Sequence, residues 1–122
     1  MASVVNNAGR AIVTNRIKGA GTEPNYVAWG TGAGTAAAAD TTLFTEASEA
    51  RIAGTSSQQT TSVTNDTYRV VQVMTANGSK TITNAGCFDA SSGGNMLCKG
   101  DFTGIVLALN ETITFTFNVQ MG

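Results

Sequence analysis

The glycine-rich segment Gly30-Thr-Gly-Ala-Gly34 is the first part of the chain that could do chemistry, because it has the glycine content of a phosphate-binding loop. A P-loop, however, needs a Lys-Ser or Lys-Thr pair at the start of a helix, and a dinucleotide site needs G-x-G-x-x-G between a strand and a helix. Neither pattern is present here. We therefore interpret the segment as a loop whose glycines let backbone segments approach closely.

Two cysteines, Cys87 and Cys98, are the next candidates. They lack a C-x-x-C spacing, and the chain has no histidine, the commonest metal ligand and the usual general base. We therefore expect no metal site and no cofactor. Residues 1–10 lack the basic start and apolar run of a secretion signal. Since cytosolic thiols stay reduced, we interpret both cysteines as small buried hydrophobes, with a disulfide as the alternative.

Eight acidic residues could supply the carboxylate pair of a glycosidase. Most of them fall in predicted turns, which favours turn and surface roles. Without a nucleophile next to a base or a set of metal ligands, we expect no catalytic residues and predict that the protein is not an enzyme. Trp29 and Tyr26 could line a sugar-binding surface, but a single Trp beside a short strand is more often a core or interface anchor.

The charge pattern excludes two classes of partner. Only 12% of the residues are charged and the formal net charge is -1. This leaves no basic surface for nucleic acid or an anionic membrane. No apolar stretch approaches the ~18 residues of a membrane-spanning helix. We expect neither nucleic acid nor membrane as a partner.

The elements that position these residues are mostly strands. Thr-rich and β-branched segments separated by Gly-rich turns predict five to eight short strands, the clearest at 26–30, 67–75, 80–89, 95–102 and 112–120. We predict an all-β fold, a β-sandwich of jelly-roll-like topology with a short N-terminal helix or arm. Residues 1–122 would form one domain, with the helix or arm in 1–24 and the β body in 25–122.

Period-two alternation and turn residues predict how the strands pair. Asn77-Gly78 is a strong hairpin signal and would join 67–75 to 80–89. A second turn at 91–94 would set Cys87 near Cys98, and Thr103-Gly104 would end the strand that follows. The predicted core contains the apolar residues of the alternating segments: Val71, Val73, Phe88, Ile113, Phe115, Phe117 and Val119.

Two segments are candidates for assembly. Residues 6–18 have apolar side chains at helical spacing, but Gly9 and two adjacent β-branched residues make this helix weak, so it needs a surface to dock on. The polar tract 55–64 is a solvated linker, an edge strand, or an arm exchanged with a neighbouring subunit. The candidate contact residues are Ile12, Val13, Ile17, Tyr26, Trp29, Gln58 and Gln59.

Three segments resemble a family of small structural proteins of tailed bacteriophages: Tyr26-Val-Ala-Trp-Gly-Thr-Gly-Ala-Gly-Thr35, Asp40-Thr-Thr-Leu-Phe-Thr-Glu-Ala47 and Asn84-Ala-Gly-Cys-Phe-Asp89. The ending, with Gly104-Ile-Val-Leu and Thr112-Ile-Thr-Phe-Thr-Phe, is also similar. Some similar proteins are capsid decoration, or cement, proteins. The resemblance covers the chain from about residue 6 onward and carries no catalytic residues.

The resemblance implies a non-enzymatic β-sandwich that assembles in several copies. We expect a decoration protein on the capsid exterior of a virion assembled in the cytoplasm of a bacterial host. Its partners would be the phage major capsid protein and further copies of itself, most simply in a homotrimer. The alternatives are a tail, baseplate or fibre component and, in another class, a carbohydrate-binding adhesin that uses Trp29 and Tyr26.

Overall fold

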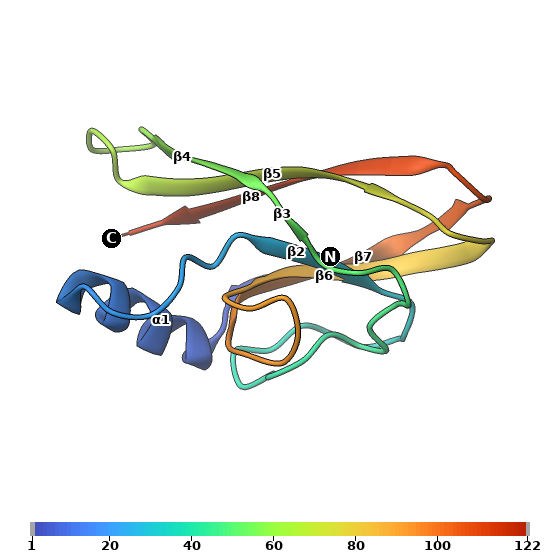
Figure 1. The fold of residues 1–122 in the computed structure, drawn as a ribbon, viewed down its shortest axis with the longest axis horizontal. Helices are drawn as coiled ribbons and strands as arrows, with labels where there is room; N and C mark the ends of the chain where they lie inside the picture. Colours follow the sequence, from blue (N-terminus) through green and yellow to red (C-terminus); the bar gives the residue numbers. More distant parts are fainter. Residues whose placement is uncertain (1, 122) are drawn as a thin grey trace.

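The fold is a sandwich of two antiparallel sheets with one helix at its edge (Figure 1). A computed structural model describes residues 2–121. The elements in chain order are β1 (Ser3–Val5), α1 (Asn7–Lys18), β2 (Tyr26–Gly30), β3 (Ile52–Ala53), β4 (Thr55–Gln59), β5 (Thr67–Thr75), β6 (Lys80–Phe88), β7 (Met96–Leu107) and β8 (Thr112–Gln120). The five-stranded sheet has the order β1-β7-β6-β2-β3, and the three-stranded sheet has the order β4-β5-β8. The predicted all-β sandwich with a short N-terminal helix is confirmed.

Most predicted strands lie where the alternation placed them. The segments 26–30, 67–75 and 112–120 are β2, β5 and β8. Strand β7 is longer than predicted, because it continues through Thr103-Gly104 to Leu107. The tract 55–64 begins with β4, which pairs with β5 of its own chain, so its interpretation as an edge strand is confirmed.

The core lies between the sheets and uses the opposite face of β5 from the one predicted. Val70 and Met74 are fully buried there, whereas Val71 is half-buried and Val73 is 45% exposed. The choice of Val71 and Val73 as core residues is therefore wrong. Strand β5 carries β-branched or apolar side chains on both faces, so alternation alone does not identify its buried side.

The other predicted core residues do pack into the interior of the protein, four of them between the sheets and Phe88 on the outer face of the wider sheet. Phe88 and Val119 are buried, and the remaining three, Ile113, Phe115 and Phe117, are half-buried against the core. On β8 only one face is apolar, and this is why its period-two pattern identified the buried side correctly.

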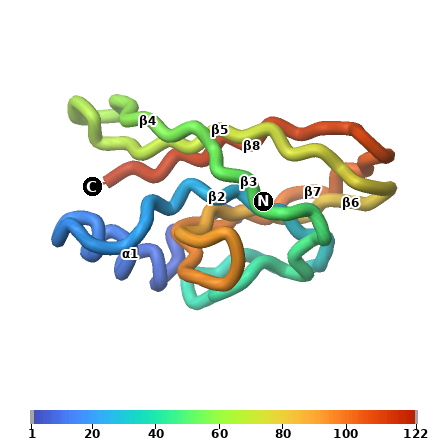
Figure 2. The backbone as a smooth tube through the Cα atoms, in the orientation of Figure 1, coloured from blue at the N-terminus to red at the C-terminus, as the bar shows by residue number. Residues whose placement is uncertain are grey.

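The predicted hairpin at Asn77-Gly78 is wrong. Strands β5 and β6 belong to different sheets, and neither Asn77 nor Gly78 adopts the positive φ that the predicted turn type requires. The backbone groups of Ala76 instead pair with the chain between β7 and β8, through 2.8 Å hydrogen bonds with Asn110 and Glu111. Two of the three crossings between the sheets, β5 to β6 and β7 to β8, thus lie side by side at one end of the sandwich, opposite α1 (Figure 2), whereas the third joins β3 to β4.

The second predicted hairpin is confirmed. Strands β6 and β7 are joined by a turn in which Gly93 and Gly94 have φ of 60° and 69°. This left-handed conformation favours glycine because it has no Cβ. The hairpin places Cys87 directly opposite Cys98, as expected from the position of the turn.

The helix begins and ends where its sequence predicts, and it docks on its own chain. Gly19 ends it with φ 87°. Ile12 is 2% exposed in the main core, and a Cβ on Gly9 would lie 2.6 Å from the carbonyl oxygen of Leu97. The buried Asn6 donates its backbone N–H to Leu97 O at 2.9 Å. The sheet of the same chain therefore supplies the docking surface that this weak helix needs.

A long loop, residues 31–51, covers the outer face of the five-stranded sheet. Leu43 packs there in a second small core with Ala28, Phe88 and Met96. The fully buried ammonium of Lys99 holds the loop by contacting Asp40 Oδ2 at 3.0 Å, Thr42 O at 2.9 Å and the ring of Phe44. A Cβ on Gly30 would lie 2.5 Å from the Phe44 carbonyl oxygen, which confirms the close-approach interpretation of these glycines.

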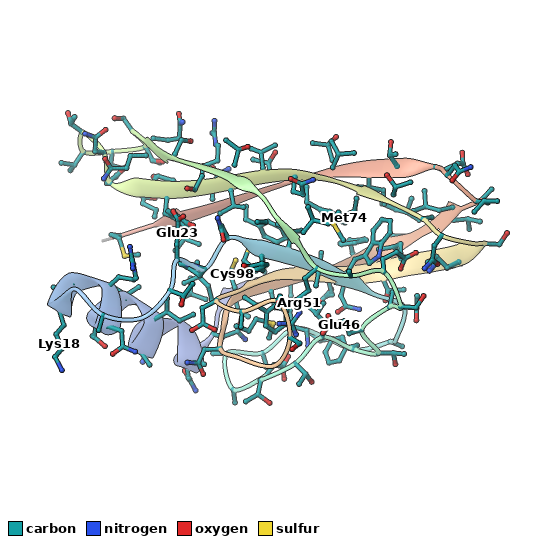
Figure 3. All side chains as sticks on the ribbon, viewed as in Figure 1. Lys18, Glu23, Glu46, Arg51, Met74 and Cys98 are labelled. Atoms are coloured by element: carbon teal, nitrogen blue, oxygen red, sulfur yellow. The ribbon has the colours of Figure 1, made fainter. Side chains whose placement is uncertain are left out.

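Two further ionic contacts fasten this loop. Arg51 pairs with Glu46 at 2.9 Å and stands over the ring of Phe88, and Figure 3 shows Arg51 and Glu46 together beside the sheet. The carboxylate of Glu49 accepts hydrogen bonds from Trp29 Nε1 and the Asn77 N–H, both at 2.9 Å, and pairs with Lys80. Burial opposes ionisation of Glu49, but these donors outweigh it and lower its pKa to about 2.

Phe115→Ala should destabilise the fold by about 2 to 3 kcal/mol, less than for a fully buried Phe because Phe115 is half-exposed. The ring has aromatic neighbours with centroids 6.0 to 6.1 Å away, Trp29, Phe102 and Phe117, and loses all three contacts. Urea unfolding measures the change. The exposed Thr114→Ala on the other face of β8 is the control and should cost less than about 1 kcal/mol. Equal losses for both variants would contradict this assignment of the core face.

Acid should weaken the fold through Glu49. Because its pKa falls from 4.5 to about 2 on folding, its contribution to stability is complete above about pH 5 and is lost as the pH falls toward 2. Glu49→Gln should lower stability at pH 7 by about 1 to 3 kcal/mol and reduce the loss between pH 5 and pH 2. Urea unfolding at several pH values checks this. An unchanged acid dependence in the variant would show that Glu49 is not its source.

Candidate assembly surface

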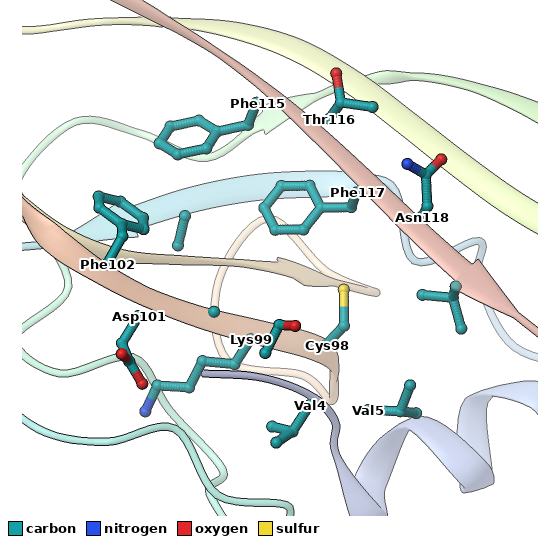
Figure 4. Close-up of a pocket in the computed structure, with 14 residues that line it drawn as sticks. Val4, Val5, Cys98, Lys99, Asp101, Phe102, Phe115, Thr116, Phe117 and Asn118 are labelled. Atoms are coloured by element: carbon teal, nitrogen blue, oxygen red, sulfur yellow. The ribbon is translucent and has the colours of Figure 1, made fainter. Parts of the chain in front are cut away.

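An open groove of about 400 Å³ runs along strand β8 (Figure 4). It exists because one sheet has five strands and the other three, so the wider sheet extends past the β8 edge. Its walls come from β1, β7 and β8, with Val4 and Val5 on one side and Phe115 and Phe117 on the other. The groove is therefore a place where the sandwich lacks a strand.

Aromatic side chains line the interior of this groove. Phe102 of β7 and Phe115 of β8 lie with ring centroids 6.1 Å apart, and Phe117 follows 6.0 Å from Phe115. All three are half-buried. Asp101 and Asn118 add polar groups to the lining, an arrangement typical of a protein contact surface with an apolar centre and a polar rim.

The three-stranded sheet has two free edges. Strand β8 pairs only with β5, and β4 likewise pairs only with β5 among residues 2–121. Neither Thr112–Gln120 nor Thr55–Gln59 contains a charged residue or a proline. Edge strands are usually protected by such residues, because unpaired N–H and C=O groups invite pairing with another chain. Both edges are open to a further strand.

The two ends of the sandwich carry exposed apolar side chains. At the helix end, a cleft of about 250 Å³ between α1 and the end of β8 is flanked by Ile17, 81% exposed, and Met121, 48% exposed. At the opposite end, near the corner between β7 and β8, three apolar residues are exposed: Ile105 by 41% of its surface, Val106 by 77% and Leu109 by 60%. These side chains are accessible to a partner.

The candidate contact residues lie in separate places. Ile12 and Trp29 are buried in the core, with 2% and 1% exposure, so their side chains serve this chain itself. Half-buried Val13 and exposed Ile17 line the helix cleft. Half-buried Tyr26 packs against the second core, while Gln58 and Gln59 lie on the β4 edge.

Sequence reasoning missed the groove itself. The alternation on β8 revealed the apolar face of Phe115 and Phe117, but assigned that face to a closed core. Their partial exposure follows from the unequal number of strands in the two sheets, which no local pattern in the sequence reveals. The absence of charge along 112–120 was the available signal of an open edge.

The burial of Trp29 argues against a sugar-binding platform. A stacking platform needs an exposed ring face, whereas Trp29 is 1% exposed, packs edge-on against Phe115 and donates its Nε1–H to Glu49. Tyr26 alone is half-exposed. The adhesin alternative therefore loses one of the two side chains on which it was based.

Several carboxylates hold loops rather than facing one another across a cleft. Asp66 accepts backbone N–H bonds from Thr61, Val63 and Ser62, which keep its pKa far below the usual value. Asp101 accepts the Ala36 N–H at 2.6 Å, and this bond lowers the Asp101 pKa. Among residues 2–121 no group of three or more His, Cys, Asp or Glu side chains could hold a metal ion. In the same range no helix is long and apolar enough to cross a membrane.

Comparison with known proteins identifies the family. The family described as "Podophage GP4 fiber I protein gp80" matches residues 6–120, nearly the whole chain. No match was found among curated proteins, and none among solved structures. The family agrees with the resemblance to structural proteins of tailed phages, but its name refers to a fibre and not to capsid decoration. The chain belongs to this podophage fibre family and is a structural component of a phage virion.

Proposed function

We propose that the protein is a fibre subunit of the virion that has no enzymatic role and assembles with further copies of itself along strand β8. The observation that carries this proposal is the row of half-exposed aromatic side chains next to a nine-residue strand with a free edge. The family name supports the location in a fibre.

Strand addition at β8 would satisfy two needs at once. A further strand would pair with the free backbone groups, each hydrogen bond contributing about 0.5 to 1.5 kcal/mol net. Its side chains would also cover Phe115 and Phe117, which are left half-exposed in the isolated chain. A groove beside a free strand edge suits an extended strand, with affinity from the main chain and specificity from the side chains.

The second free edge offers the matching surface on the next copy. Strands β4 and β8 both run antiparallel to β5, so they point in the same direction on opposite edges of one sheet. If β8 of one copy pairs with β4 of the next, the strands are parallel and the contact is heterologous, so a closed ring results when the rotation fits. We propose a homotrimer, in which Gln58 and Gln59 would lie at each junction.

Capsid decoration is the competing location for the same assembly surface, with the major capsid protein as partner. Labelling intact particles with antibody against the protein, or locating its density by cryo-electron microscopy, separates the two. We expect density confined to fibres. Density spread over the capsid shell in many copies would contradict the fibre location and favour the decoration protein.

Thr116→Lys should break the assembly while leaving the subunit folded. Thr116 is exposed in the middle of β8, and a charge on an edge strand discourages further pairing. Ser91→Lys in the exposed β6–β7 turn is the matched control, because it adds the same charge away from both edges. Sedimentation equilibrium should give a trimer for the natural protein and the control, and a monomer for Thr116→Lys.

Circular dichroism should give the same β-rich spectrum for all three proteins. A natural protein that stays monomeric at high concentration, or a Thr116→Lys variant that remains trimeric, would overturn assembly through β8.

A further inference from the structure

We propose that Cys87 and Cys98 are a redox-active pair that a small disulfide oxidant, entering through the groove, converts into a cross-strand disulfide. The two thiols are free in the described structure. The proposal concerns the free subunit, whose groove along β8 is still open, and does not depend on where the subunit lies in the virion.

The sheet register places the two cysteines opposite each other. Cys87 of β6 and Cys98 of β7 are Cα partners in an antiparallel ladder, so their side chains project from the same face. Directly opposed residues in such ladders have Cα atoms ~4.5 or ~5.5 Å apart, depending on their hydrogen bonding. Both values lie within the ~4.4 to 6.8 Å that a disulfide accepts. The register therefore places the two Cα atoms within the range of separations that a disulfide spans.

The two side chains already interact. Burial raises the pKa of the Cys87 thiol, and the neighbouring Cys98 side chain raises it further. Cys87 is fully buried and remains a thiol until a partner sulfur comes within reach. This makes Cys87 the resolving residue rather than the first to react.

Access to the pair is through Cys98. Its side chain is 7% exposed and lines the groove, where Figure 4 shows its sulfur pointing toward Phe117. The groove volume of about 400 Å³ has room for a small disulfide such as cystamine. Cys98 therefore meets the oxidant first.

The reaction balances as two thiol–disulfide exchanges. The Cys98 thiol loses its proton to solvent, and its thiolate attacks one sulfur of cystamine, forms a mixed disulfide and releases cysteamine as a thiolate that takes up a proton from solvent. Cys87 then loses its proton to solvent and attacks the Cys98 sulfur, which forms the protein disulfide and releases the second cysteamine. The two protein thiols are oxidised, and the disulfide bond of cystamine is reduced to two thiols.

The product would fasten the middle of the wider sheet. The bond would close the β6–β7 hairpin and join the two strands that carry the most residues of the sheet's core. A disulfide stabilises mainly by restricting the unfolded chain. A subunit that meets an oxidising environment while its groove is open would thus gain stability.

Oxidation with cystamine of the purified full-length protein, diluted until sedimentation shows monomers, tests the proposal. We expect the intact mass to fall by about 2 Da, both thiols to become unreactive in denaturant, and peptide mapping to link residues 87 and 98. The thermal midpoint should rise by about 5 to 10 °C and return after treatment with dithiothreitol. A stable cystamine adduct, a disulfide-linked dimer, or two thiols that stay free over days would each overturn the proposal.

Two single variants test the order of the steps. Cys87→Ala should accumulate a cystamine adduct at Cys98, because no resolving thiol remains. Cys98→Ala should leave Cys87 unmodified under the same conditions, because Cys87 is fully buried. Modification of Cys87 in the Cys98→Ala variant would contradict entry through the groove. The natural protein alone decides whether the disulfide forms, so the test remains valid if a variant folds poorly.

Discussion

The unequal width of the two sheets is the constraint on which the other features of this structure depend. Three strands cannot cover five, so one side of the sandwich stays open along β8. The side chains that would fill a closed core, Phe102, Phe115 and Phe117, therefore become the lining of a groove. The same gap gives Cys98 its small exposure. Covering the aromatic row would stabilise the protein but would also close the groove that exposes Cys98. Stability and the accessibility of Cys98 are thus opposed along this edge.

The outer face of the wider sheet, unlike the groove side, is covered. Instead of a third layer of secondary structure, the loop 31–51 covers it, and a loop needs specific anchors because it lacks a regular hydrogen-bond ladder. Lys99, Arg51 and Glu49 supply them through ion pairs and contacts with aromatic rings. Six of the 15 charged residues of the chain form the three ion pairs that hold this loop. This explains why a protein with only 12% charged residues has some of them buried.

Local patterns predicted the elements better than their pairing. The alternation of 112–120 identified β8 and its dry face because its other face is polar throughout. The segment 67–75 gave the strand but the wrong face, since valines occur on both sides. Asn77-Gly78 predicted a hairpin that the fold replaces with a crossing between sheets, because Ala76 pairs with residues 110–111, some 35 positions away in sequence, and not with its neighbours. Long-range pairing decided each outcome that the local signal missed.

The buried candidate contact residues and the unpredicted groove show the same limit of local sequence patterns. Ile12 was chosen because a weak helix needs a surface to dock on, and Trp29 because a single Trp beside a short strand is often a core or interface anchor. The chain itself provides the partner surface of both. The groove depends on how many strands each sheet recruits, which is a property of the whole fold. Yet the free edge of β8 could be recognised in the sequence, because the nine residues of this strand carry no charge. An isolated soluble protein with such an edge risks uncontrolled strand pairing. A subunit whose edge is covered in the proposed assembly would avoid that risk, because a further strand would cover the aromatic row and pair with the free backbone groups at the same time.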